Sequence, residues 1–100
     1  MGSARRSRAK LASVRKQIDR LDFQLLRLLN RRACMALQIG RIKKRKKWPV
    51  YDARREAFVL RRVAQANSGP LSSAAVRQIF QTVLTQCRRR ERSSRKGSRG

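Results

Sequence analysis

No histidine occurs among the 100 residues of this sequence, and only five residues are acidic. Histidine is the side chain that most often transfers protons near neutral pH. Its absence excludes His-based acid–base catalysis, catalytic triads and His metal sites. The two cysteines, Cys34 and Cys87, fit no metal-binding spacing and are too few for a disulfide framework. We therefore expect a reduced, intracellular and cytoplasmic protein that holds no metal.

Negative charge is scarce while positive charge is abundant: 28 Lys and Arg residues oppose 5 Asp and Glu residues, for a net charge of +23. This excess is typical of proteins that bind nucleic acid, and it would also attract a small anionic substrate. Four basic residues fall within residues 1–10 and seven within residues 88–100. We expect basic, disordered tails over residues 1–10 and 92–100. Long apolar runs are missing as well, so we expect neither a signal peptide nor a membrane span.

The strongest pattern lies in residues 11–45, where apolar side chains recur at the 3-4 spacing of a helix that packs against other helices. Nine of the ten positions on its two seams are apolar, and the tenth is Arg32. An arginine on such a stripe is costly to bury unless an anion meets it. The seams consist of Leu11, Ile18, Leu25, Arg32 and Ile39, and of Val14, Leu21, Leu28, Met35 and Ile42.

This predicted helix is long for so short a chain. No proline interrupts it before Pro49, and its one glycine, Gly40, lowers helix stability by only about 1 kcal/mol. About 35 residues of helix span about 50 Å, whereas a compact domain of this size is only about 30 Å across. A chain of this length also has little area for a core of its own. We therefore predict an intertwined homodimer, in which a second copy covers the overhanging helix.

Two shorter helices are predicted after a connector at residues 48–51, where a proline pushes the preceding residue out of helical geometry. Asp52 is a good N-cap for the second helix, and apolar positions between residues 57 and 64 continue it. Residues 67–70 (NSGP) end it, and Ser72 or Ser73 caps a third helix whose apolar stripe reaches Cys87. No segment alternates with period two. The predicted fold is all-α, with one long and two shorter helices per chain.

Several polar residues lie where they would face the core. Arg32 and Lys43 are three turns apart on nearly the same helical face, and Glu91 extends the inner face of the third helix. Each also has an ordinary interpretation. Arg32 fits the rim of a stripe with its charge in water, and Lys43 fits a solvated basic run. Asp52 fits a helix cap and Cys87 a small core residue, so these residues taken singly leave both interpretations open.

Ordered motifs run through residues 11–91, which we take as one domain between the two tails. They are Arg15, Ile18, Asp19, Leu21, Asp22, Leu25, Leu26, Leu28, Leu29 and Arg32, then Ile39, Gly40 and Lys43, then Pro49, Val50, Tyr51, Asp52, Arg55 and Glu56, and finally Gly69, Pro70, Leu71, Ser72, Ile79 and Phe80. In combination they resemble the AroQ-class (all-helical) chorismate mutases. The ordered set is specific, whereas the long helix alone would not be.

The resemblance implies an entwined homodimer that rearranges chorismate to prephenate in phenylalanine and tyrosine biosynthesis. The reaction is an intramolecular [3,3] shift that needs no cofactor, metal, nucleophile or proton transfer. The enzyme must hold a flexible dianion in a compact chair and stabilise charge on the ether oxygen as the C–O bond breaks. By resemblance, Arg32 and Arg15 bind the two carboxylates, with Arg15 contributed by the other chain of the dimer.

The resemblance assigns the remaining site residues as well. Lys43 would donate a hydrogen bond to the ether oxygen and so favour the transition state. Glu56 would accept one from the substrate hydroxyl, with Asp52 and Arg55 lining and ordering that wall.

Two positions depart from the usual family pattern. Cys87 stands where a serine is often found, and a thiol is a weaker hydrogen-bond donor. Glu91 stands where a glutamine faces the ether oxygen. An ionised glutamate cannot donate a hydrogen bond and repels developing negative charge, so Glu91 must be protonated to assist. We expect activity to fall as the pH rises through the ionisation of Glu91.

Three alternatives remain open at the level of sequence. An enzyme of the same fold that eliminates pyruvate from isochorismate would share these motifs. A small basic nucleic-acid-binding protein would explain the net charge, although aromatic residues for stacking are few and no recognition motif is present. The chain would also fit a catalytic or regulatory piece of a larger polypeptide of aromatic biosynthesis.

Overall fold

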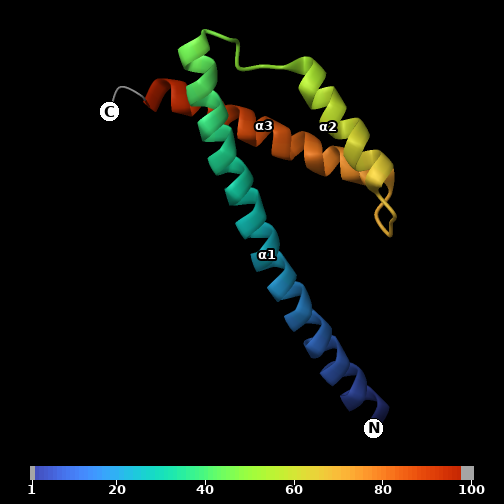
Figure 1. Ribbon diagram of the computed structural model, residues 1–100. Helices are drawn as coiled ribbons and strands as arrows, with labels where there is room; N and C mark the ends of the chain where they lie inside the picture. Colours follow the sequence, from blue (N-terminus) through green and yellow to red (C-terminus); the bar gives the residue numbers. More distant parts are fainter. Residues whose placement is uncertain (1, 98–100) are drawn as a thin grey trace. The chain divides into compact units, whose positions relative to one another are not determined.

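The computed structural model describes residues 2–97, which form three α-helices and no strand (Figure 1). Helix α1 runs from Gly2 to Lys46, α2 from Ala53 to Ala66 and α3 from Ser73 to Gly97. The predicted all-α class, with one long and two shorter helices, is confirmed. Within the described part of the chain, no helix is both long enough and apolar enough to cross a membrane. The chain divides into two compact units, residues 1–31 and residues 32–100.

The ends of the chain differ from the predicted disordered tails. Helix α1 begins at Gly2, so residues 2–10 are helical, and α3 continues through residues 92–97. Ala, Arg and Lys make up most of residues 2–10, and Arg and Lys make up half of residues 92–97. These residue types have favourable helix propensities, and no proline interrupts them, so both helices continue beyond their apolar stripes. Residues 1 and 98–100 of the predicted tails lie outside the described residues.

The first unit is the N-terminal part of α1, and every residue from 2 to 31 is exposed in the single chain. Its seam residues are 43–60 % exposed although all are apolar: Leu11, Val14, Ile18, Leu21, Leu25 and Leu28. Their spacing places them on one face of the helix. Full burial of one such side chain stabilises a fold by about 1.5–3 kcal/mol. In the single chain these side chains stay exposed, so the fold does not gain this stabilisation.

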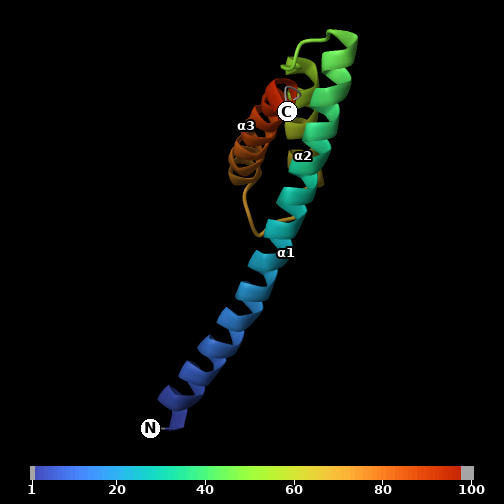
Figure 2. The same ribbon diagram turned by 90° about the vertical axis from the view of Figure 1, so that its left-hand side faces the viewer.

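The second unit contains residues 32–46 of α1 together with α2 and α3, and α2 packs along α3 (Figures 1 and 2). Its buried apolar residues come from α1, the connector and α3, while α2 contributes no fully buried residue. They are Ala36, Val50, Val76, Leu84 and Cys87. A core this small agrees with the shortage of buried area expected for a chain of this length.

Gly40 sets how closely α1 approaches α3 within the second unit. A Cβ atom at this position would lie 2.5 Å from the carbonyl oxygen of Glu91 and 2.9 Å from its Cα atom, so the helices would have to separate. One turn further along α3, the buried Ser94 donates a hydrogen bond from Oγ to the carbonyl oxygen of Leu37 at 2.9 Å. Because Gly40 has no side chain, the backbone of Glu91 can lie directly against α1 at this position.

The turns between the helices use predicted capping residues. Asp52 Oδ1 accepts a backbone N–H of the first turn of α2 at 3.0 Å. Ser72 rather than Ser73 caps α3, because its Oγ accepts the backbone N–H of Ala75 at 3.1 Å. Between these helices Gly69 adopts a φ of +81°, the left-handed conformation expected of a glycine after a helix end.

Candidate functional site

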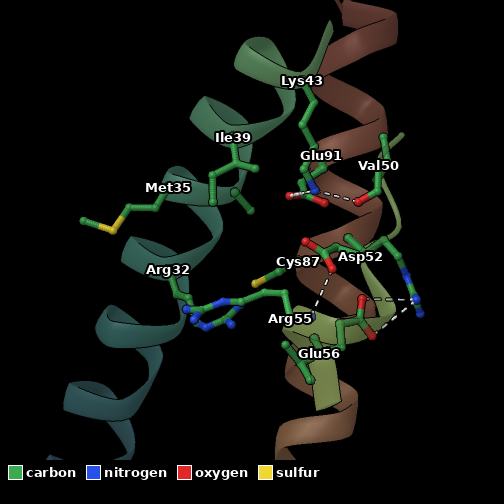
Figure 3. A pocket seen from close by; sticks show the side chains of 13 residues that line it. Arg32, Met35, Ile39, Lys43, Val50, Asp52, Arg55, Glu56, Cys87 and Glu91 are labelled. Carbon is green, nitrogen blue, oxygen red and sulfur yellow. Dashed lines mark hydrogen bonds and ion pairs between the residues drawn. The ribbon is translucent and has the colours of Figure 1, made fainter. Parts of the chain in front are cut away.

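A cavity of about 270 Å³ lies in the second unit, between residues 32–43 of α1, the connector that follows α1, and the facing sides of α2 and α3 (Figure 3). Its volume is close to the lower end of the range for small-molecule pockets, about 300–1,000 Å³. Four cationic, three acidic and six largely apolar residues line it. They are Arg32, Met35, Ala36, Ile39, Lys43, Val50, Asp52, Arg55, Glu56, Leu84, Cys87, Arg88 and Glu91.

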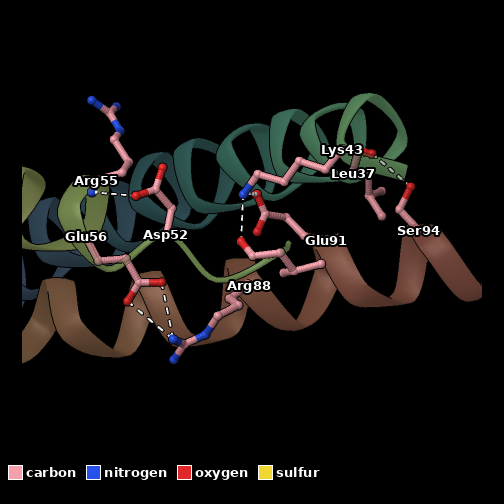
Figure 4. A network of polar contacts seen from close by, with 9 residues as sticks. Leu37, Lys43, Asp52, Arg55, Glu56, Arg88, Glu91 and Ser94 are labelled. Atoms are coloured by element: carbon pink, nitrogen blue, oxygen red, sulfur yellow. Dashed lines mark hydrogen bonds and ion pairs between the residues drawn. The ribbon is translucent and has the colours of Figure 1, made fainter. Parts of the chain in front are cut away.

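Lys43 is held at one end of the cavity by two acceptors (Figures 3 and 4). Its Nζ donates to the carbonyl oxygen of Val50 at 2.6 Å and to Oε1 of Glu91 at 3.2 Å. The side chains of Lys43 and Glu91 are only 17 % and 12 % exposed. Lys44 and Arg45, its neighbours in the basic run, are exposed. The solvated-run interpretation is therefore wrong for Lys43, because the helical period turns this one residue of the run inward.

Glu56 is paired with Arg88, which joins α2 to α3 across the cavity wall (Figure 4). Nη1 of Arg88 donates to Oε2 of Glu56 at 3.3 Å and to Oε1 at 3.4 Å. The guanidinium carbon of Arg88 also lies 4.8 Å from the centroid of the Tyr51 ring. The Arg88 and Glu56 side chains are 20 % and 15 % exposed. Solvent screens such a pair less than it screens a surface pair.

Asp52 and Arg55 line the cavity near the start of α2. The carboxylate of Asp52 accepts a hydrogen bond from the backbone N–H of Arg55, so Asp52 caps α2 and also lines the cavity. The guanidinium carbon of Arg55 lies 5.3 Å from the centroid of the Phe58 ring. Within residues 2–97, no carboxylate forms an ion pair with Arg55.

Arg32 extends from α1 into the cavity and is partly buried (Figure 3). Among the described residues its guanidinium has no hydrogen-bond acceptor and no ion-pair partner. A guanidinium presents five N–H donors in a planar fork that fits a carboxylate through two parallel hydrogen bonds. Arg32 is therefore available to an anionic ligand that enters the cavity.

Seven of the eight site residues named from the sequence line this cavity: Arg32, Lys43, Asp52, Arg55, Glu56, Cys87 and Glu91. Cys87 is buried, as its interpretation as a core residue requires, and also reaches the cavity wall. The eighth residue, Arg15, is exposed on α1 in the first unit and does not line the cavity. A role for Arg15 in the cavity of another chain stays a prediction.

Arg88 lines the cavity and binds Glu56, although it was not among the site residues predicted from the sequence. The signal was present, because Arg88 lies four residues after Leu84 and three before Glu91 on the inner stripe of α3. Two exposed arginines, Arg89 and Arg90, follow it directly, and residue type alone does not distinguish Arg88 from them. Position relative to the stripe was the informative property.

Residues 14–92 match the sequence model of chorismate mutase type II. A bifunctional chorismate mutase/prephenate dehydratase of Neisseria gonorrhoeae is 42 % identical over 73 residues, which are 73 % of this chain and 20 % of that protein. A chorismate mutase of Methanocaldococcus jannaschii is 35 % identical over 54 residues, which are 54 % of each chain. The chain spans 20–23 % of the length of the bifunctional relatives that it matches.

The fold is similar to that of a solved structure, chorismate mutase (form II) from Thermus thermophilus. The two structures superpose with a TM-score of 0.82 at 29 % sequence identity. The superposition covers 83 % of this chain and 94 % of that chain. The likeness therefore extends well beyond the residues that line the cavity.

Proposed function

This chain belongs to the chorismate mutase type II family, and we propose that it rearranges chorismate to prephenate in the biosynthesis of phenylalanine and tyrosine. Arg32 carries the proposal, because it is a partly buried cavity guanidinium that no group within residues 2–97 satisfies. Chorismate is a dianion whose carboxylates fit guanidinium forks. Its rearrangement is intramolecular and needs no nucleophile or proton transfer, which suits a chain without histidine.

Binding and orientation form the first part of the proposed mechanism. Arg32 takes one carboxylate of chorismate, and Arg15 of a second chain takes the other. Two fixed carboxylates hold the flexible ether side chain over the ring in the reactive chair. Fixing the reacting groups in this way removes a large entropic part of the barrier.

Electrostatic stabilisation of the breaking C–O bond forms the second part. Lys43 Nζ is fixed between the carbonyl oxygen of Val50 and the carboxylate of Glu91, so its remaining N–H is available to the ether oxygen. Negative charge develops on that oxygen only as the bond breaks, so this donor binds the transition state better than the substrate. When protonated, Glu91 adds a second donor; when ionised, it offsets the charge of Lys43.

The wall formed by α2 contributes the remaining contacts. Glu56 accepts a hydrogen bond from the hydroxyl group of chorismate, since an ionised carboxylate is an acceptor only. Asp52 fixes the first turn of α2 through its cap and thereby orders the backbone that carries Arg55 and Glu56. Arg55 adds a second cavity guanidinium without an acidic partner in the described part of the chain.

We propose a homodimer with two such sites, and the first unit supports it. The apolar seam of residues 11–28 is about half exposed in the single chain, and the second unit buries few apolar side chains. A second copy supplies a complementary apolar seam, because identical chains pair through the same surface under two-fold symmetry. The same pairing would bring Arg15, which flanks the seam, to the other chain.

The cytoplasm is the proposed compartment. Both cysteines are free thiols, and Cys34 is exposed. Free thiols at a surface persist in reducing compartments.

Chorismate consumption tests the proposed activity directly. Purified protein should deplete chorismate absorbance, and prephenate should be the product. Arg32→Ala should lower kcat/KM by about 10²–10³-fold, since it removes a charge-assisted contact from a partly buried site. Arg41→Ala is the matched control, because Arg41 is exposed on the same helix and does not line the cavity. Equal losses in the two variants, or release of pyruvate from isochorismate instead, would contradict the proposal.

Nucleic-acid binding is a second candidate function, favoured by the net charge of +23. Basic side chains are exposed on α1 and α3 outside the cavity. Binding of this kind weakens steeply with salt, because each neutralised phosphate releases counterions. A salt titration of binding to duplex DNA, run beside the chorismate assay, separates the two candidates.

A further inference from the structure

We infer that Arg88 is a positioning residue that holds the carboxylate of Glu56 against α3 and so keeps Arg32 and Arg55 available for the substrate. The inference rests on the proposed function and adds a residue to its site. Arg88 itself binds no part of the substrate in this proposal. It acts through Glu56, by deciding which cation in the cavity that carboxylate pairs with.

The charges that line the cavity lead to this assignment. Four cations face three acids, and two of the acids form ion pairs: Glu91 with Lys43 at 3.2 Å and Glu56 with Arg88 at 3.3 Å. The carboxylate of the third acid accepts a backbone N–H at the start of α2. Arg32 and Arg55 are the two lining cations left without an acidic partner among residues 2–97. Two guanidinium groups are therefore open to the carboxylates of a dianion.

The geometry of Arg88 suits a fixed support. One nitrogen, Nη1, reaches both carboxylate oxygens of Glu56. The Tyr51 ring lies 4.8 Å from the guanidinium carbon, within range of a cation–π contact that orients the group. Both partners of the pair are less than one quarter exposed. A pair of this kind holds one arrangement more firmly than two flexible surface charges do.

Removal of Arg88 would leave Glu56 as an unpaired carboxylate beside unpaired arginines. Arg55 directly precedes it on α2, and Arg32 reaches into the same cavity from α1. Pairing with either one would lower the energy of the partly buried charge. The substrate would then have to displace Glu56 before it could bind. The expected defect is weaker binding of substrate, with chemistry little changed once the substrate is bound.

A double-mutant cycle with Glu56 tests this role, measured as kcat and KM for chorismate. Arg88→Gln should raise KM about tenfold, because an ion pair worth roughly 1.4 kcal/mol must break before binding, while kcat changes less than about threefold. In a Glu56→Gln background the competing charge is gone. There the same substitution should raise KM less than about threefold, since interacting residues are non-additive. Arg88→Lys keeps a cation opposite Glu56 and should leave KM within about threefold of the parent.

Arg89→Gln is the matched control, because Arg89 is exposed, is the neighbour of Arg88 and does not line the cavity. A KM effect of Arg88→Gln that is as large in the Glu56→Gln background as in the parent would overturn the inference, since Arg88 would then act on the substrate or on the fold. An unchanged KM in the parent background would overturn it too.

Folding is checked by thermal unfolding of each variant. If Arg88→Gln does not fold, Arg88→Met repeats the cycle with a side chain that suits a partly buried position. Loss of folding in both of these variants and in Arg88→Lys would show a structural role and overturn the inference. An inactive parent protein contradicts the proposed function as a whole, which is distinct from an active parent whose Arg88 variants are normal.

Discussion

The two units of the chain use the same apolar spacing with different results. From residue 2 to residue 31 no side chain is buried, although a seam of apolar residues lies along the helix. From Arg32 onward the same helix meets α3, with Gly40 at the contact and Ala36 in the core. The cavity and both ion pairs belong to this second unit.

This difference shows what a repeating apolar pattern does and does not specify. The pattern indicates that a helical face needs a partner, because burial of that face is the main source of stability. It does not indicate which chain supplies the partner. For residues 32–46 the partner is α3 of the same chain. For residues 11–28 we propose a second copy.

A charge on the seam of the first unit should have the largest effect. Leu25 is 56 % exposed, so Leu25→Asp in a lone chain would change the free energy of unfolding by about 0.5 kcal/mol or less. In the proposed dimer it buries one carboxylate per chain and should destabilise the assembly by about 4 kcal/mol or more. Light scattering should therefore report dissociation. Asn30→Asp adds the same charge away from the seam and should leave the mass unchanged; a dimer that survives Leu25→Asp would show that the seam is no interface.

In the proposed enzyme, Arg15 of one chain binds the substrate in the cavity of the other chain. Mixing two variants tests this arrangement. Arg15→Ala and Arg32→Ala should each lower kcat/KM about 100-fold. An equimolar mixture should recover about a quarter of the parent activity, because half of randomly paired dimers are mixed and one of their two sites keeps both arginines.

Lys16→Ala is the control for this mixing experiment, since Lys16 is the exposed neighbour of Arg15. It should keep nearly full activity alone. If Arg15 serves the cavity of its own chain, the mixture of Arg15→Ala and Arg32→Ala stays as inactive as its components.

Gly40→Ala should destabilise the second unit while sparing the first. Alanine raises helix propensity by about 1 kcal/mol, yet its Cβ would collide with the backbone of Glu91. Such overpacking typically costs about 1–3 kcal/mol, so we expect a net loss of unfolding free energy, measured by urea denaturation. Gly2→Ala is the control, because its Cβ would meet only the flexible side chain of Arg6, at 3.7 Å. A stabilised Gly40→Ala protein would mean that the helices separate freely.

Glu91→Gln should show the smallest effect, and it tests the acid beside Lys43 in the second unit. Oε1 of Glu91 lies 3.2 Å from Nζ of Lys43. A glutamine at this position removes the negative charge that offsets Lys43 and supplies an N–H donor that can face the ether oxygen. We expect kcat for chorismate to rise by up to about tenfold in this variant. A kcat equal to or below that of the parent protein would refute this role.

Many features of the second unit could be predicted from rules that involve only neighbouring residues in the sequence. Asp52 was recognisable as the cap of α2 because a cap needs only an acceptor side chain next to free N–H groups. Arg32 was recognisable because it breaks an apolar stripe of fixed spacing. Residues 2–10 and 92–97, which charge and composition predicted to be tails, are helical in the structure, in keeping with the favourable helix propensities of Arg, Lys and Ala.

The sequence by itself determined the number and order of the three helices, the capping residue of α2 and the helical face that Arg32 and Lys43 share, because these depend on periodicity and on neighbours within one or two turns. The tertiary structure alone decided that Arg88 binds Glu56, 32 residues away, and that the backbone of α3 lies against α1 at Gly40. Contacts between distant segments depend on how helices are placed to within about an ångström. The spacing of residues along the sequence does not give the distance between one helix and another to that accuracy.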